Sequence, residues 1–280
     1  MEGTALVLGG GGPVGGAWLA GVLAGLADGG VDLGTAEVVI GASAGAIFGA
    51  RLASGETPRS MYERQLTGAD RIELHVSAAR TFRFLWAALG SRDPERSVRR
   101  LGRAALAART VPEAEVFDAL RPLLHGVEDW PGRALRVAVV DAASGGLAHF
   151  DRDSGVSLAR ALAASCAVPL IWPPVTALGR RWMDGGSRAT TPFGLAHGYR
   201  RVLAVSPIPT AVGPHPHARR QADELAAEGT AVSLLVPDRA ARRAMGRDMT
   251  ADHRRADAAH AGHRQGVEMA GPVAELVSGG

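Results

Sequence analysis

The stretch that decides the fold is VVIGASAGAI, residues 38–47, in which an apolar, β-branched run leads directly into a G-x-S-x-G frame. A buried strand followed by this frame and by a small-residue, helix-compatible segment is typical of a nucleophile elbow. In such an elbow Ser43 lies at a sharp strand-to-helix turn, where the flanking glycines leave room for its strained backbone. The same letters also fit a plain small-residue turn that packs a helix tightly against a strand, so the rest of the chain has to decide between the two.

The segment before this stretch has the same strand, loop and helix order. The apolar run TALVL (residues 4–8) stops at GGGGPVGG (residues 9–16), and apolar residues then recur at helical spacing to about residue 27. Two such units in succession favour a parallel sheet with helices on its faces. Loops that follow adjacent parallel strands leave the same edge of the sheet, so we expect Ser43 and the glycine-rich loop to be neighbours.

Strand signals fade after Pro58 and return near residue 134. We predict a helical insertion over about residues 58–124, in the position of a cap or lid, and then further strands at about 134–140, 201–206 and 231–236. A hairpin over 175–183 should end in Asp184-Gly185-Gly186, and another helix should begin within 192–197. The expected fold is a single α/β domain over residues 1–280, with a mainly parallel central sheet flanked by helices and a C-terminal extension of strand and helix over 213–280.

The composition is that of a folded protein. Hydrophobic residues make up 46% and charged residues 21% of the 280 residues, enough for a sizeable core. The single cysteine, Cys166, excludes an intramolecular disulfide framework, and no run of about eighteen apolar residues predicts a membrane span. Because the chain begins with a strand-like run rather than a basic and then apolar leader, we expect a cytoplasmic protein.

The charge pattern leaves membrane contact open. The net charge is +3, and arginine supplies all of the positive charge because the chain has no lysine, which fits the coding bias of a GC-rich genome. We expect no nucleic-acid partner, and the sequence does not reveal an oligomeric state. An apolar helical face precedes a basic stripe, and together they read either as an ordinary amphipathic insertion or as an edge that contacts an anionic membrane peripherally. The apolar face is Phe82, Leu85, Trp86 and Leu89, and the stripe is Arg92, Arg96, Arg99, Arg100 and Arg103.

The glycine-rich loop has two readings. Residues 10–15 satisfy G-x-G-x-x-G between a strand and a helix, the context of a dinucleotide-binding loop. That fold also needs an acidic residue at the end of the next strand, whereas Asp32 and Glu37 lie before that strand or at its start. The other reading is an oxyanion hole, since consecutive glycines turn several amide groups toward one point without interference from a Cβ atom.

A serine nucleophile needs a base, and the histidines do not supply an evident one. His197 lies in a helix-like stretch, while His215 and His217 lie in a proline-rich loop, and we expect all three at the surface. Asp184, beside two glycines, is the other candidate, although an Asp-Gly turn that closes a hairpin has the same letters. An aspartate has an unperturbed pKa of about 3.9 and is a weak base, so a pair with Ser43 would depend on donors that stabilise the oxyanion.

The remaining reactive side chains predict no further site. Cys166 lies beside a proline turn with no base placed for it, which favours a small buried residue over a nucleophile. The last histidines of the chain are spaced as scattered helix-surface residues and do not form a convincing set of metal ligands. We therefore expect neither a metal nor a cofactor. These histidines are His253, His260 and His263.

Four blocks in order now resemble the patatin-like phospholipase family: the glycine loop, G-x-S-x-G, the block ASCAVP (residues 164–169), and D-G-G at 184–186. The resemblance covers residues 9 to about 192. It implies a three-layer patatin-like fold and a serine acyl hydrolase that uses a Ser/Asp dyad without histidine. Matched residue by residue, Ser43 is the nucleophile, Asp184 its partner, and Gly10, Gly11 and Gly12 form the oxyanion-hole loop.

The implied activity is cleavage of carboxylic esters of lipids, as in a lipase, phospholipase A or esterase. Two positions depart from the family pattern: Val14 stands where a basic residue is common, and Thr190 where an asparagine is common. The missing cation puts in doubt how strongly an oxyanion or an anionic head group is held. It gives weight to a non-catalytic, lipid-binding member as an alternative, and the dinucleotide-binding protein remains a further one.

Overall fold

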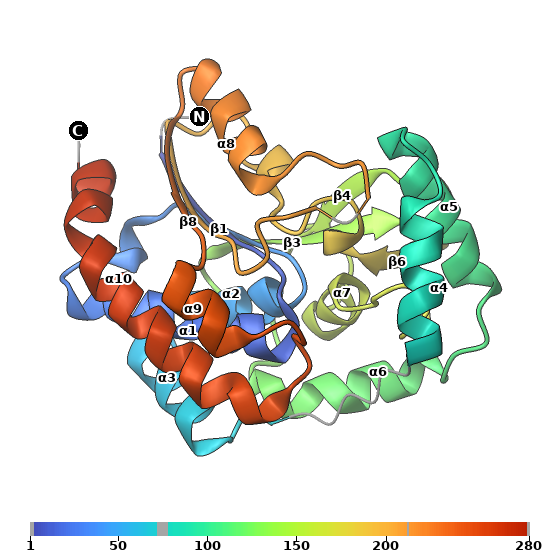
Figure 1. The fold of residues 1–280 in the computed structure, drawn as a ribbon, viewed down its shortest axis with the longest axis horizontal. Helices are drawn as coiled ribbons and strands as arrows, with labels where there is room; N and C mark the ends of the chain where they lie inside the picture. Colours follow the sequence, from blue (N-terminus) through green and yellow to red (C-terminus); the bar gives the residue numbers. More distant parts are fainter. Residues whose placement is uncertain (1–2, 72–77, 212, 279–280) are drawn as a thin grey trace.

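The computed structural model describes residues 3–71, 78–211 and 213–278, and its ribbon is shown in Figure 1. Within these residues a single sheet holds eight strands. The strands are β1 (Thr4–Leu8), β2 (Val38–Gly41), β3 (Ala134–Asp141), β4 (Leu147–Phe150), β5 (Val175–Ala177), β6 (Arg180–Asp184), β7 (Arg201–Val205) and β8 (Ala231–Leu235). The helices are α1 (Gly12–Asp28), α2 (Ala44–Ala53), α3 (Pro58–Thr67), α4 (Ala78–Leu89), α5 (Pro94–Ala107), α6 (Glu113–Leu120), α7 (Leu158–Ser165), α8 (Ala218–Ala227), α9 (Arg239–Met245) and α10 (Arg255–Ser278).

The sheet is mainly parallel, as predicted. Its strand order is β5-β6-β3-β2-β1-β7-β8, with β4 also paired to β3. The run from β3 to β8 is parallel throughout, whereas β4, β5 and β6 pair antiparallel at one edge. Leu8 lies opposite both Gly41 and Val205, so β1, β2 and β7 end level with one another. The loops after β1 and β2 therefore leave the sheet side by side.

Helices cover both faces of the sheet, which gives three layers (Figure 1). Successive side chains of a strand point to opposite faces. Leu6 and Leu8 of β1 pack into a core with α1, α2, α7 and α10, while Ala5 and Val7 pack into a second core with α8. The apolar run of β1 is buried on both sides, as expected for a central parallel strand.

Close packing of α1 on α10 joins the two ends of the chain. A Cβ atom built on Gly21 would lie 2.1 Å from the carbonyl oxygen of Ala259, and one built on Gly262 would lie 2.1 Å from that of Trp18. Glycine at both positions therefore lets the two helix backbones touch. The C-terminal helix is part of the main core rather than an appendage.

The predicted insertion is helical throughout its described part, where α3, α4, α5 and α6 follow one another. Two local predictions were wrong. Residues 192–197 contain only a short 3-10 turn, Phe193–Leu195, and strand β4 was not expected. Strand β4 forms because Asp141 Oδ1 accepts the amide hydrogens of Ala143 and Ser144, which closes a turn and returns the chain along β3. None of the helices in the described ranges is long and apolar enough to cross a membrane.

Candidate active site

Ser43 lies at the turn between β2 and α2 with a strained backbone. Its φ of 52° and ψ of −123° lie in a region that residues other than glycine rarely adopt. Glycine is required at both flanking positions because neighbouring backbone lies too close for a side chain. A Cβ atom on Gly41 would lie 2.5 Å from Ala46 Cα, and one on Gly45 would lie 2.2 Å from the Leu8 carbonyl oxygen. The G-x-S-x-G stretch thus has the geometry of a nucleophile elbow.

The glycine-rich loop lies directly against the elbow. A Cβ atom on Gly10 would lie 3.2 Å from Ser43 Cβ, so the two motifs are neighbours, as the parallel sheet predicts. The amide of Gly10 donates to the carbonyl oxygen of Thr190 at 2.7 Å and is already used. The amides of Gly11 and Gly12 donate to no acceptor in the part of the chain that the structure describes, which leaves these two as donors next to Ser43.

Asp184 ends strand β6 and lines the same pocket as Ser43. Its amide donates to the Ala167 carbonyl oxygen at 3.0 Å, and its Oδ1 accepts the amide hydrogen of Gly186 at 2.6 Å. Burial raises the pKa of Asp184 to about 6, and the Gly186 amide and the Ser43 hydroxyl hold it back from rising further. The carboxylate is therefore a stronger base than an exposed aspartate and is still ionised at neutral pH.

Ser165 connects the elbow to the sheet, a role that the sequence did not reveal. This fully buried side chain accepts the amide hydrogen of Ser43 at 2.9 Å and donates to the carbonyl oxygen of Ala138 at 2.7 Å. Two residues on, Ala167 accepts the amide of Asp184. The ASCAVP block thus holds the backbones of both Ser43 and Asp184. The signal that could have pointed to this was the resemblance of this block to the family pattern.

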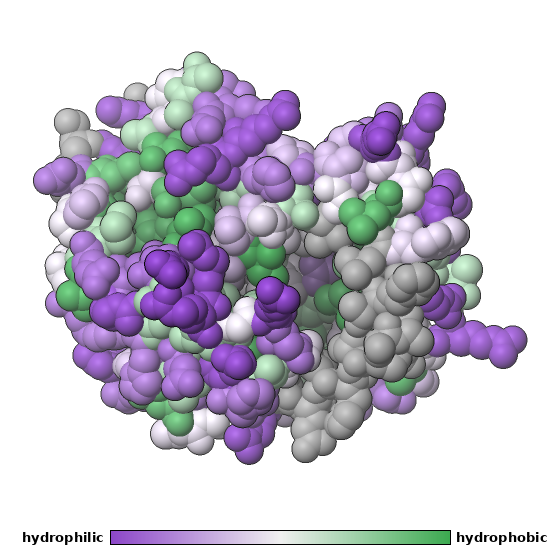
Figure 2. Space-filling model, in the orientation of Figure 1, coloured by the Kyte–Doolittle hydropathy of each residue, from purple (hydrophilic) through white to green (hydrophobic). Residues whose placement is uncertain are grey.

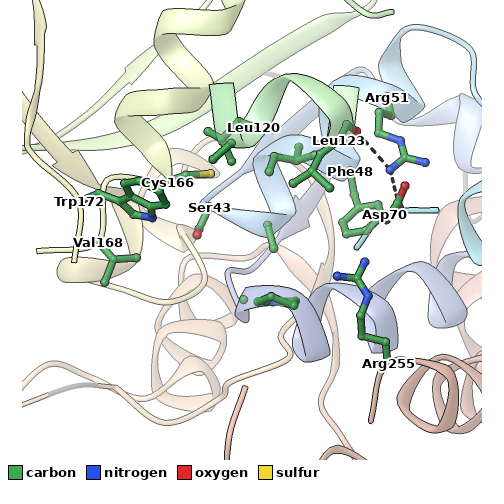
Figure 3. Close-up of a pocket in the computed structure, with 15 residues that line it drawn as sticks. Ser43, Phe48, Arg51, Asp70, Leu120, Leu123, Cys166, Val168, Trp172 and Arg255 are labelled. Atoms are coloured by element: carbon green, nitrogen blue, oxygen red, sulfur yellow. Dashed lines mark hydrogen bonds and ion pairs between the residues drawn. The ribbon is translucent and has the colours of Figure 1, made fainter. Parts of the chain in front are cut away.

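A largely apolar cavity of about 100 Å³ opens beside Ser43 (Figure 3). Ile47 and Phe48 of α2, Leu120 of α6 and Trp172 contribute to its wall. A second pocket that Ser43 also lines includes Asp184, the glycine loop and Phe84 of α4. The apolar surface suits an acyl chain, and Phe84 places the helical insertion at the site.

The two departures from the family pattern have structural explanations. Val14 is fully buried in the core, and its amide donates to the Met249 carbonyl oxygen at 3.0 Å. A hydrophobic side chain therefore fits this position where a cation would have to be buried. Thr190 orders the glycine loop through its carbonyl oxygen, and its hydroxyl donates to the Ile208 carbonyl oxygen at 2.7 Å.

Cys166 lies as expected, and so do two of the three histidines between residues 197 and 217. Cys166 is buried, and burial together with the nearby Asp184 carboxylate raises the pKa of its thiol, which keeps it protonated. His197 and His217 are exposed, but His215 is buried, so its predicted surface position was wrong. Its loop packs on the insertion: a Cβ on Gly213 would lie 2.7 Å from the Ala88 carbonyl oxygen.

Two of the three C-terminal histidines, His260 and His263, make structural contacts, and His253 is exposed. His260 hydrogen-bonds the Tyr62 hydroxyl at 2.7 Å, and His263 stacks on the Tyr62 ring and contacts Asp28. In the ranges that the structure describes, no group of three or more His, Cys, Asp or Glu side chains could hold a metal ion.

Comparison with known proteins gives a family match over most of the chain. The family model described as patatin-like phospholipase matches residues 6–197. No curated protein matches the chain. Among solved structures, VipD from Legionella pneumophila is similar with a TM-score of 0.48 and 14% identity, over 97% of this chain and 67% of that one.

Two structures of ExoU are similar to a comparable degree. The type III effector ExoU gives a TM-score of 0.46 at 17% identity, over 98% of this chain and 53% of that one. Full-length ExoU in complex with full-length SpcU, from Pseudomonas aeruginosa, gives 0.41 at 16%, again over 98% and 53%. The present chain thus spans about half the length of ExoU.

Replacing Ser165 tests whether it holds the elbow. In Ser165→Ala the buried Ser43 amide and Ala138 carbonyl group lose their partner, so we expect the free energy of unfolding to fall by about 1–3 kcal/mol. Fluorophosphonate labelling of Ser43 should slow by at least tenfold. Ser187→Ala is the matched control for stability, because the hydroxyl of this buried serine has no partner among the described residues. Its unfolding free energy should stay within about 0.5 kcal/mol of wild type, and equal effects of the two changes on stability would contradict the assignment.

Proposed function

The chain belongs to the patatin-like phospholipase family, and from this premise we propose that it is a serine acyl hydrolase that cleaves carboxylic esters of lipids. The observation that carries the proposal is the strained elbow at Ser43 with the buried Asp184 carboxylate in the same pocket. An apolar cavity beside the serine supports an acyl substrate.

The proposed mechanism uses Asp184 as the general base. Asp184 accepts the Ser43 hydroxyl proton as Oγ attacks the ester carbonyl carbon, and the protonated carboxyl then gives that proton to the departing alcohol. The product of this half-reaction is an acyl-enzyme on Ser43. Water, deprotonated by Asp184, attacks the acyl carbon, and Ser43 regains its proton as the fatty acid leaves.

The oxyanion is assigned to the amides of Gly11 and Gly12. Both are free of protein acceptors within the described residues, whereas Gly10 is engaged by Thr190. Donors of this kind contribute about 2.7–4 kcal/mol each to transition-state stabilisation. Gly10 serves the site in a different way, because a Cβ atom at this position would make a tight contact, at 3.2 Å, with Ser43 Cβ.

Replacing the two dyad residues tests the reaction. We expect Ser43→Ala to abolish fluorophosphonate labelling, and Ser43→Ala and Asp184→Asn each to lower kcat on a short acyl ester by about a thousandfold or more, as for residues that act as a unit. Circular dichroism should show both variants folded. A folded variant with full esterase activity would disprove the dyad. Binding to lipid vesicles with no turnover by wild type would favour the non-catalytic alternative, and saturable NAD(P) binding without labelling would favour the dinucleotide reading.

The pH dependence tests the base. Asp184 must be ionised to accept a proton, and burial raises its pKa to about 6. We therefore expect kcat/KM to rise with pH, with a midpoint at about pH 6, and then to level off. An exposed aspartate would give a midpoint near pH 3.9 instead. A limb near 4 in the measured profile would contradict the assignment.

The same group links activity to stability. Because the folded state raises this pKa, ionised Asp184 destabilises the fold above about pH 6, and the effect is absent below about pH 4. Asp184→Asn should accordingly raise the unfolding free energy by roughly 2–3 kcal/mol at about pH 8, with little gain at about pH 4.

We further propose that the insertion meets an anionic lipid surface. Trp86 and Leu89 of α4 are 64% and 63% exposed, and the Arg100 guanidinium stacks on the Trp86 ring at 3.9 Å from its centroid. Figure 2 shows hydrophobic and hydrophilic residues side by side at this corner of the molecule. The side chains of Phe82 and Leu85 fall outside what the structure describes. Because Phe84 of the same helix lines the active-site pocket, a membrane here would lie next to Ser43.

Vesicle binding tests this surface. Co-sedimentation with anionic phospholipid vesicles should fall as salt rises past about 0.1 M, where screening acts within about 10 Å. Leu89→Ala should weaken binding several-fold by removing exposed apolar area, whereas Leu178→Ala, equally exposed on the β5-β6 hairpin, should not. Binding that ignores salt, or equal losses in both variants, would refute the proposed surface.

A further inference from the structure

The cavity beside Ser43 ends in charged groups. Its apolar wall runs from the elbow along α2, and its far end is formed by Arg51, Asp70 and Arg255 (Figure 3). All three residues are at least 95% buried. A cavity for a plain hydrocarbon tail would need no charge at this end, since burying charged groups is unfavourable unless they are fully paired.

The length of the cavity fits a chain of moderate length. Ser43 and Arg51 are eight residues apart at one side of α2, which corresponds to about 12 Å along the helix axis. An extended covalent chain advances about 3.3–3.6 Å per three bonds, so about 12 Å is spanned by roughly ten bonds. The volume of about 100 Å³ is small beside the 300–1,000 Å³ of ordinary ligand pockets and leaves no room for a branched or second chain.

Two of the three charged groups, Arg51 and Asp70, are well paired. Arg51 donates to both carboxylate oxygens of Glu56, to Asp70 Oδ2 at 2.7 Å and to the Leu123 carbonyl oxygen. Asp70 also accepts hydrogen bonds from Gln65 and pairs with His125. Burial would lower the pKa of Arg51, but Glu56 and Asp70 raise it above its ordinary value. Arg51 thus uses four of its five N–H donors, and the Asp70 carboxylate has three partners, so both groups are largely engaged within the protein.

Arg255 is different, because its guanidinium is buried with donors to spare. Among the described residues it makes one hydrogen bond, from Nη2 to Gln65 Oε1 at 2.6 Å, and Nη1 forms a long ion pair with Asp252 Oδ1, at 3.7 Å. Its Nε–H has no acceptor among the described residues. Asp252 is itself shared with Arg71. A guanidinium has five N–H donors in a planar fork that matches a carboxylate. The arrangement therefore leaves guanidinium donors without hydrogen-bond acceptors, among the described residues, at the end of an apolar cavity.

We infer that the enzyme prefers acyl groups whose far end carries a carboxylate, which Arg255 binds. The inference rests on the proposed acyl hydrolase function and specifies its substrate class: esters in which one carboxyl group of an unbranched diacid is esterified and the other is free. A methyl terminus of the same length would leave the Arg255 donors buried and unpaired, whereas a carboxylate accepts them in charge-assisted hydrogen bonds. Arg255 belongs to α10, beyond the residues matched by the family model, so this specificity belongs to this chain's C-terminal helix.

Matched ester pairs test the inference. The two substrates are the mono-para-nitrophenyl ester of a straight-chain diacid and the para-nitrophenyl ester of the fatty acid of equal length, over a series of lengths. Wild type should favour the diacid ester in kcat/KM by at least tenfold at the best length. In Arg255→Met the ratio of the two kcat/KM values should fall by at least tenfold, mainly through KM, because the contact is made alike in the ground and transition states.

Two variants make the result specific. Arg255→Lys keeps the charge without the planar fork and should give an intermediate ratio. Arg264→Met is the matched control, since this arginine lies on the same helix with its side chain 49% exposed and should leave the ratio unchanged. The wild-type preference needs no variant, so it decides the inference even if Arg255→Met does not fold.

The outcomes separate this inference from the proposed function. If wild type hydrolyses both esters through Ser43 but favours the methyl-ended one, the inference about Arg255 fails and the hydrolase stands. An unchanged ratio in a folded, Ser43-labelled Arg255→Met has the same meaning. If neither ester is turned over and Ser43 is not labelled, the proposed function itself fails.

Discussion

The left-handed backbone at Ser43 is the constraint on which the rest of the site depends. A residue with a side chain in such a conformation costs about 1–3 kcal/mol and persists only when its surroundings enforce it. Here the enforcement is specific: Gly41 and Gly45 let β2, α2 and β1 approach within contact distance, and Ser165 binds the Ser43 amide from the side. This backbone conformation places the Ser43 side chain in the pocket that the glycine loop and Asp184 also line.

The site as a whole divides its polar groups between two places. Near Ser43, burial raises the pKa of the Asp184 carboxylate, which one amide and one hydroxyl stabilise among the described residues. At the other end of the cavity, the buried guanidinium of Arg255 also has fewer acceptors than donors in the part of the chain that the structure describes. Incomplete pairing of buried charge is unfavourable for stability. In the proposed reaction, the substrate supplies the missing partner at each of the two places.

Prediction from the sequence worked where a short pattern is tied to one local geometry. The elbow, the first two strand and helix units, the hairpin that ends at Asp184 and the helical insertion all follow from spacing within about twenty residues. It failed where a loop packs on a distant element. His215 sits in a proline-rich loop that reads as exposed, yet the loop is covered by the insertion, and β4 depends on a turn closed by Asp141. Phe84 was passed over because its place at the pocket is set by how α4 docks.

The sequence by itself therefore determined the order of the strands along the chain, the elbow at Ser43 and the chemical types available to it, because these depend on local periodicity and on glycine. The tertiary structure alone decided which groups share a cavity and how well each is paired. Three features depend on contacts between residues that lie 30 to more than 200 positions apart in the chain. They are the hydrogen bond of Ser165 to Ser43, the position of Arg255 at the far end of the cavity, and the amides of Gly11 and Gly12 that have no acceptor among the described residues. Burial and pairing are sums over neighbours from the whole fold, and no stretch of sequence contains them.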